Sequence, residues 1–181
     1  MRGSVAPILG ELIAFRRDLH RYPELSTKEF RTTDRIVEVL ADAGLSPVRL
    51  DGTGAYVDIG EGPLRLALRA DIDALPVLEE TNLGYASVNT GITHACGHDI
   101  HTTVMVGVAQ ILAAFEAAGE LGGRVRVIFQ PAEEVMPGGA LGVIKQGVLE
   151  GVPRILALHC DPRIDVGQVG TRIGAITSAS D

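Results

Sequence analysis

Residues 55–70, AYVDIGEGPLRLALRA, mark the point where the chain changes from a helical to an extended pattern. Two short apolar runs, 55–60 and 64–70, flank Glu61-Gly62-Pro63, a segment of turn-forming residues. Apolar runs of this length on either side of such a turn are typical of paired strands. We therefore expect the two runs to form a β-hairpin.

The segment upstream has helical periodicity. Residues 8–22 place apolar side chains three or four positions apart, and Pro23 ends this predicted helix. Ser26-Thr27-Lys28-Glu29 has the S-x-x-E form of a capping box, which predicts the start of a second helix. That helix ends at Gly44, a residue typical of a helix C-terminus.

Helices and strands alternate downstream of residue 70. Strands alternating with helices indicate an α/β fold, here a layered α/β/α domain with a central mostly parallel (mixed) sheet and an antiparallel edge. The last residues, AITSASD (175–181), are small and polar, like the start of a linker. The predicted elements are helices at 98–118 and 140–151 and strands at 124–130, 154–159 and 168–174, of which the strand at 154–159 is expected to be buried.

Composition excludes several functions. The chain has 181 residues, 46% of them hydrophobic, which is enough for one domain with a packed core. A formal net charge of −7 without a Lys/Arg block argues against nucleic-acid binding. The longest strongly apolar stretch, 104–115, is too short for a membrane span, which needs about 20 residues, and no signal peptide is evident. Two cysteines make a disulfide framework improbable and favour the cytoplasm.

Polar residues that could carry chemistry follow three predicted strands. Asp71 and Asp73 come after 64–70, Glu133 and Glu134 come after 124–130, and His159 ends 154–159. In open α/β sheets, ligands bind beyond the carboxyl ends of the strands. We therefore expect a functional site at that edge of the sheet.

The stretch HACGHDIH, 94–101, concentrates groups that bind metals or move protons. Thiolate and imidazole both suit zinc and similar ions, and Gly97 would let Cys96 and His98 turn toward one centre. The alternative is a buried cysteine beside a capping histidine. Asp99 could hold a ligand imidazole by its far nitrogen, and His101 could face the site or pack beneath it, while the role of His94 stays open.

The adjacent acids Glu133 and Glu134 fit a metal hydrolase. Such an enzyme needs one carboxylate on the metal and another that takes a proton from water. The alternative is a pair of solvated surface acids. A cysteine nucleophile at Cys96 is a rival mechanism, but it leaves the glutamate pair unexplained. A non-catalytic metal-binding or interaction module is the rival from another class of protein.

Five motifs in order resemble a known family: FRRDLHRYPELSTKE (15–29), LRADIDALP (68–76), HACGHDIHTTVMVG (94–107), VIFQPAEE (127–134) and ALHC (157–160). Together they resemble the N-acyl-amino-acid amidohydrolases. This is the hippurate hydrolase and auxin-conjugate hydrolase branch of the aminoacylase and carboxypeptidase-like metallopeptidases. The resemblance runs from about Phe15 to the C-terminus.

The resemblance implies a site with two divalent metal ions, zinc or manganese, with cobalt or nickel as alternatives. A metal-bound water would attack the amide carbonyl of an N-acyl amino acid, and Glu133 would act as the general base. Arg69 stands where the wider family often has a ligand histidine, so the resemblance carries over no ligand at that position. By motif, the implied metal ligands are Cys96, His98, Glu134 and His159, and Asp71 is a further catalytic residue beside Glu133.

Members of this family are considerably longer. The resemblance therefore implies that residues 1–181 are the N-terminal part of an incomplete, metal-binding catalytic domain. The lid and dimerisation domain, and the C-terminal part of the catalytic domain with a further ligand histidine, would be absent. We expect impaired metal affinity and little or no turnover for this chain alone, and a homodimer for the full-length protein through the lid.

Overall fold

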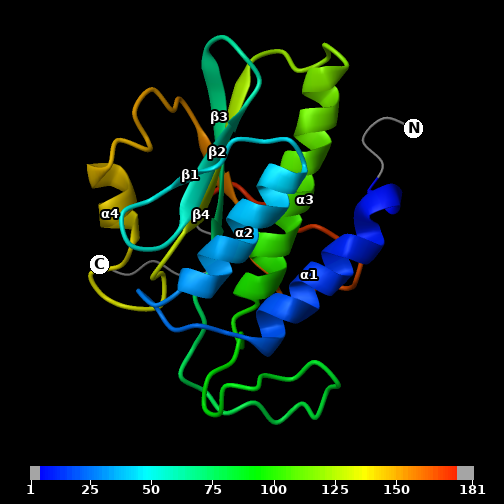
Figure 1. Ribbon diagram of the computed structural model, residues 1–181, viewed down its shortest axis with the longest axis vertical. Coiled ribbons are helices and arrows are strands. Elements are labelled where there is room, and N and C mark those ends of the chain that lie inside the picture. Colours follow the sequence, from blue (N-terminus) through cyan, green and yellow to red (C-terminus); the bar gives the residue numbers. More distant parts are fainter. Residues whose placement is uncertain (1–4, 175–181) are drawn as a thin grey trace.

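The computed structural model describes residues 5–174, which form a five-stranded sheet with helices on both faces (Figure 1). The strand order is β1-β2-β4-β3-β5. β1, β2 and β4 pair antiparallel, whereas β3 is parallel to both β4 and β5. The sheet is therefore mixed, as expected. The strands are β1 (Val48–Arg49), β2 (Ala55–Ile59), β3 (Leu64–Asp71), β4 (Arg124–Gln130) and β5 (Ile155–Ala157).

The predicted hairpin is wrong, because β4 lies between β2 and β3. Phe129 of β4 is in register with Ala55 on one side and with Ala70 on the other. β4 is buried on both faces over residues 127–130, so it belongs at the centre of the sheet, where both faces are covered. The turn after β2 also packs on the start of β4, since a Cβ added to Gly60 would lie 2.7 Å from the Gly123 carbonyl oxygen.

The helices complete three layers. α1 (Leu9–Arg21), α2 (Phe30–Asp42) and α3 (His98–Ala117) cover one face of the sheet, and the short α4 (Ala140–Lys145) covers the other (Figure 1). Side chains alternate between the two faces along β4. Val127 and Phe129 join the core with α1 to α3, whereas Ile128 packs with Val143 of α4. The predicted α/β/α layering is confirmed.

The start of α2 differs from the predicted capping box. No side chain caps α2 at its N-cap, Glu29. Instead the carboxylate of Glu24 accepts hydrogen bonds from the backbone N–H groups of Arg31 and Thr32, at 3.1 and 2.7 Å. Ser26 donates to Asp73, so its hydroxyl is used elsewhere. The capping-box prediction is wrong, because the side chains of Ser26 and Glu29 both form hydrogen bonds with distant parts of the fold instead.

Further differences lie in the last third of the chain. α4 is shorter than the predicted helix at 140–151, and residues 168–174 contain no strand. β5 was predicted to be buried, but Ile155 and Leu156 are 48% and 58% exposed. β5 is only three residues long and pairs with β3 along one edge, which leaves its side chains uncovered. The predicted linker at 175–181 lies outside the described residues.

α3 is the central helix of this fold. Among residues 5–174, it is the one helix whose length and mean hydropathy, 1.4, would allow it to cross a membrane. The core helix of a layered domain has the same properties. α3 packs against α1 and β3, and its first turn carries His98, Asp99 and His101, which all have polar partners inside the protein.

Candidate metal centre

His98, the first residue of α3, is the centre of the predicted site. Gly97 precedes it with φ of +89°, a left-handed conformation that lets the chain turn sharply into the helix. The ring is 1% exposed, and its Nδ1–H donates to the Asp73 carbonyl oxygen at 2.9 Å. This bond leaves the lone pair of Nε2 free, and no described residue donates a hydrogen bond to it. An unpartnered buried nitrogen needs a ligand to satisfy it.

Three carboxylates surround this free nitrogen. Asp71 Oδ1 and Glu134 Oε1 each lie 3.6 Å from His98 Nε2, and Glu133 Oε2 lies 3.9 Å away. Burial alone would lower the pKa of His98, but its hydrogen bond to Asp73 and the nearby carboxylates raise it overall. Negative charge is therefore concentrated around His98 Nε2, as a cation site requires.

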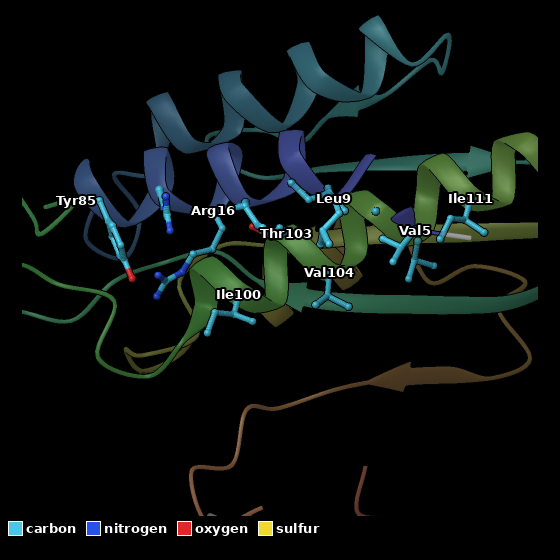
Figure 2. A pocket seen from close by; sticks show the side chains of 13 residues that line it. Val5, Leu9, Arg16, Tyr85, Ile100, Thr103, Val104 and Ile111 are labelled. Carbon is cyan, nitrogen blue, oxygen red and sulfur yellow. The ribbon is translucent and has the colours of Figure 1, made fainter. Parts of the chain in front are cut away.

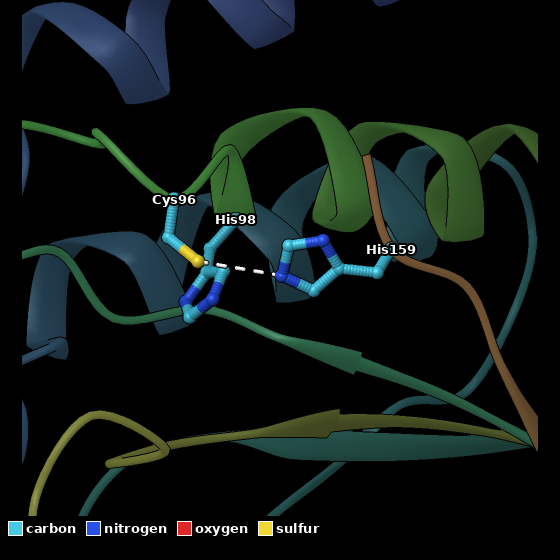
Figure 3. Close-up of side chains that lie close together, drawn as sticks. All are labelled: Cys96, His98 and His159. Atoms are coloured by element: carbon cyan, nitrogen blue, oxygen red, sulfur yellow. Dashed lines mark hydrogen bonds between the residues drawn. The ribbon is translucent and has the colours of Figure 1, made fainter. Parts of the chain in front are cut away.

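Cys96 and His159 add donors beside His98 (Figure 3). The Cys96 thiol lies 3.3 Å from His159 Nε2, and His159 Nδ1–H donates to the Cys160 carbonyl oxygen at 2.7 Å. Burial first, and then the charge of Glu134, raise the pKa of the Cys96 thiol to about 12. A metal ion bound here would have to displace the thiol proton.

The residues present fit a metal ion. Three overlapping groups of side chains hold their donor atoms within 4.8 Å of one another, and all three include His98. Glu134 Oε1 is a second buried atom without a hydrogen-bond partner. Sulfur, nitrogen and oxygen donors together suit zinc and its neighbours among the divalent ions. The three groups are Cys96–His98–His159, His98–Glu133–Glu134 and Asp71–His98–His101.

Asp71 and His101 hold each other. His101 Nδ1–H donates to Asp71 Oδ1 at 2.6 Å, and its Nε2 accepts the Cys160 N–H at 2.9 Å. Arg69 donates to the other oxygen of Asp71 at 2.6 Å. Burial opposes ionisation of Asp71, but His101 and the charges of His98 and Arg69 lower its pKa. Both ring nitrogens of His101 are therefore bonded within the protein, and the ring ties the end of β3 to the residue after His159.

Asp73 has a larger part than its sequence position suggested. Its Oδ2 accepts the Ser26 hydroxyl at 2.6 Å and the Glu134 N–H at 3.0 Å. Its carbonyl oxygen fixes the His98 ring. Burial would raise its pKa, but hydrogen bonds to the carboxylate, first from His98 to Oδ1 at 3.3 Å and then from Glu134 and Ser26, lower the pKa of Asp73 to about 2. Asp73 thus joins His98 to the Glu133–Glu134 loop.

Glu133 is the more exposed member of the glutamate pair. Its side chain is 41% exposed, against 20% for Glu134. Burial, followed by the charges of Glu134 and Asp71, raises the pKa of Glu133 above its ordinary value. A carboxylate with a raised pKa and access to solvent is suited to accept and return a proton.

Asp99 does not have its predicted role. It was expected to hold a ligand imidazole, but Asp73 holds His98, and Asp99 accepts from His20 Nδ1 of α1 at 2.7 Å. The other ring nitrogen of His20 lies 3.0 Å from Glu79. His94 is buried near His20, with neither ring nitrogen bonded to a described residue, and burial lowers its pKa to about 4.

A separate groove of about 650 Å³ lies between α1 and α3 (Figure 2). Leu9, Ile13 and Val104 form apolar walls, and Arg16 lies at one end with its guanidinium 5.2 Å from the Tyr85 ring. None of the predicted metal ligands lines this groove, so it is distinct from the metal-competent cluster.

A layered α/β domain with metal-competent donors at the carboxyl ends of its strands defines the class of metallohydrolases with an open sheet. Residues 67–179 match the model of peptidase family M20/M25/M40, and the chain belongs to this family. The family resemblance is confirmed.

Individual relatives agree with this assignment. The chain is 48% identical over 176 residues to an N-acetyl-L-cysteine deacetylase of Bacillus subtilis, covering 94% of this chain and 41% of that protein. It is 50% identical over 173 residues to a Rhodococcus jostii protein provisionally named glutamate–cysteine ligase 2-3, covering 94% of this chain. The match covers only 21% of that protein, so the ligase name says little about this segment.

A solved structure shows the same fold. The YxeP protein of B. subtilis, described as a dinuclear metal-binding peptidase of the M20 family, superimposes with a TM-score of 0.87 at 44% identity. The match covers 93% of this chain and 48% of YxeP. The chain therefore spans less than half the length of each of these three relatives.

Proposed function

We propose that the full-length protein is a metal-dependent amidohydrolase that cleaves the amide bond of N-acyl amino acids. One observation carries this proposal: Glu133, a carboxylate with a raised pKa, lies 3.9 Å from the unpartnered His98 Nε2 and beside the second acid, Glu134. A non-catalytic metal-binding module has no use for a free base beside its ligands.

We assign Cys96, His98, Glu134 and His159 as ligands of two divalent ions. Zinc suits these sulfur, nitrogen and oxygen donors best, and manganese is the alternative that the family resemblance implies. When bound, the ions polarise the amide carbonyl and lower the pKa of water. The name of YxeP, a dinuclear metal-binding peptidase, supports the number of ions. Asp73 keeps the proton of His98 on Nδ1, so that Nε2 remains free as a donor atom.

Glu133 acts as the general base in this proposal. Its carboxylate takes a proton from the attacking water and returns it to the amine nitrogen that leaves. Asp71 supports the site from beneath, because it fixes His101 and adds negative charge near His98. A Cys96 nucleophile is less well supported, since the pKa of the thiol is raised to about 12 and the reactive thiolate would be scarce.

The substrate class rests on the family motifs and on a relative. The deacetylase name of the relative that is 48% identical supports an N-acyl amino acid as substrate. We further propose a cytoplasmic location, since both cysteines are free thiols, and a homodimer formed through a lid domain outside residues 1–181.

Glu133→Gln in the full-length protein tests this function. We expect kcat/KM for N-acetyl-L-cysteine and for hippurate to fall at least about 100-fold, the usual effect of losing a general base, while metal content stays unchanged. Glu61→Gln, an exposed acid in the β2–β3 turn, is the matched control and should hydrolyse at the wild-type rate. Residues 1–181 alone should show little or no turnover. Equal rates for wild type and Glu133→Gln would contradict the assignment.

A further inference from the structure

Glu29 is a buried carboxylate that the proposed chemistry does not use. The residue is 0% exposed and precedes α2, far in sequence from the proposed ligands and base. Its Oε1 accepts the backbone N–H of Ala132 at 2.7 Å, and its Oε2 accepts the Thr53 hydroxyl at 2.7 Å. Both oxygens of this buried acid therefore accept hydrogen bonds, and one of these bonds comes from the loop that carries Glu133 and Glu134. A buried acid in this position calls for an explanation.

Ala132 has an unusual backbone conformation. Its φ is +52°, in the left-handed region that residues with a Cβ rarely adopt. The Ala132 carbonyl oxygen accepts the Gly139 N–H at 2.7 Å, and a Cβ added to Gly139 would lie 2.0 Å from the Pro131 carbonyl oxygen. The turn that follows β4 is therefore tight and strained, and it sets the direction of Glu133 and Glu134.

The position of Glu29 is itself fixed. Thr33 donates its hydroxyl to the Glu29 carbonyl oxygen at 2.6 Å and accepts the Gly54 N–H at 2.8 Å. A Cβ added to Gly54, which has φ of +91°, would lie 2.7 Å from the Phe129 carbonyl oxygen. This chain of contacts connects Glu29 to the start of β2 and the end of β4, directly beneath the turn.

Two buried carboxylates thus accept hydrogen bonds from backbone N–H groups that lie two residues apart in the same turn. Glu29 holds Ala132, and Asp73 holds Glu134. We propose that Glu29 is a positioning residue, which keeps Ala132 in its left-handed conformation and so aims Glu133 and Glu134 at His98. This inference rests on the proposed function, in which Glu133 is the base and Glu134 a ligand.

Three substitutions separate geometry from charge. Glu29→Gln keeps the side-chain length and a carbonyl oxygen for the Ala132 N–H, and its amide can donate to the Thr53 oxygen. Glu29→Asp keeps the charge but is one methylene shorter, so its oxygens withdraw from Ala132. Glu29→Leu has neither an acceptor nor a charge. Positioning predicts that Gln rescues function and Asp does not, whereas an effect of charge predicts the reverse order.

The experiment uses the full-length protein loaded with Zn²⁺ and N-acetyl-L-cysteine as substrate. We expect kcat of Glu29→Gln within about 3-fold of wild type, and kcat of the Asp and Leu variants lower by about 30-fold with little change in KM, as for a displaced catalytic group. Zn²⁺ affinity, measured by competition with a chelator, should fall about 10-fold in the same two variants, because Glu134 lies on the same turn.

Asp58→Asn is the matched control. Asp58 binds Arg126 through two hydrogen bonds of 2.7 Å, away from the turn, so its loss should lower Tm without changing kcat or Zn²⁺ affinity. Wild-type kcat and Zn²⁺ affinity in Glu29→Asp, or a Gln variant as impaired as Leu, would overturn the inference. If Glu29→Leu does not fold, the Asp and Gln pair decides. An inactive wild type would contradict the proposed function, while the order of Zn²⁺ affinities would still test Glu29.

Discussion

Asp73 connects the proposed ligand His98 to the loop of the proposed base. A carboxylate that is 1% exposed would ordinarily favour its neutral form. Donors from Ser26 and Glu134, together with His98, keep it ionised and hold its pKa at about 2. Because hydrogen bonds in the folded protein stabilise the ionised form of Asp73, this residue contributes to the stability of the fold as well as to the site.

This contribution predicts a pH dependence. The folded pKa of Asp73, about 2, lies below its ordinary value of 3.8, so its stabilisation is present above pH 4 and is lost as pH falls toward 2. Asp73→Asn should lower the free energy of unfolding by about 2 kcal/mol at pH 5, and the difference should vanish below pH 2. Urea denaturation of the metal-free proteins measures it, and a difference independent of pH would contradict the role of the charge.

At this scale, chemical type and motif were enough to nominate Cys96, His98 and the glutamate pair, and the structure brings them together. They were not enough for Asp73 or Glu29. Asp71 and Asp73 both follow the same strand, and only the tertiary fold shows which one reaches His98 Nδ1. Glu29 has the sequence context of a helix cap, while its partner Ala132 lies 103 positions along the chain.

Among the elements, α1 and α3 are joined by a buried polar contact as well as by apolar packing. His20 of α1 bonds to Asp99 of α3, and Glu79 holds the other ring nitrogen. The hydrogen bond to Asp99 is the main cause of the raised pKa of His20; burial opposes it, and Glu79 adds to it. Since Asp99 follows His98, this contact also fixes the first turn of α3.

The contact predicts a second pH dependence, opposite in sign to that of Asp73. Because the folded pKa of His20 lies above its ordinary value of 6.5, the stabilisation is complete below pH 6.5 and is lost as pH rises through the folded pKa. His20→Gln should lower the free energy of unfolding by about 1–3 kcal/mol at pH 6, the usual range for hydrogen bonds to charged groups. A difference between wild type and variant that grows with pH would contradict this role.

Local pattern predicted most elements but not how they pair. The spacing of apolar residues predicts a helix in 8–22 and a strand in 124–130, and both are confirmed. The hairpin failed because the partner of β2 comes from a segment more than sixty residues later in the chain. β1 has only two residues and no detectable pattern, so it was not predicted.

In the whole molecule, the site is a consequence of strand direction. β3, β4 and β5 run parallel, so their carboxyl ends bring Asp71, Glu133, Glu134 and His159 to one edge, beside the start of α3. This part of the site was predictable from the alternation of strands and helices. The exposure of β5 and His159 was not, because it depends on what covers the edge of the sheet.

The central claim is that Cys96, His98, Glu134 and His159 hold two metal ions. Metal analysis of the purified full-length protein, wild type against Cys96→Ala/His98→Ala, tests it most directly. Cys160→Ala is the matched control, because that thiol lies beside the cluster but outside the proposed ligands. We predict two ions per chain in wild type and in the control, and loss of metal in the double variant. Two ions per chain in the double variant would contradict the claim.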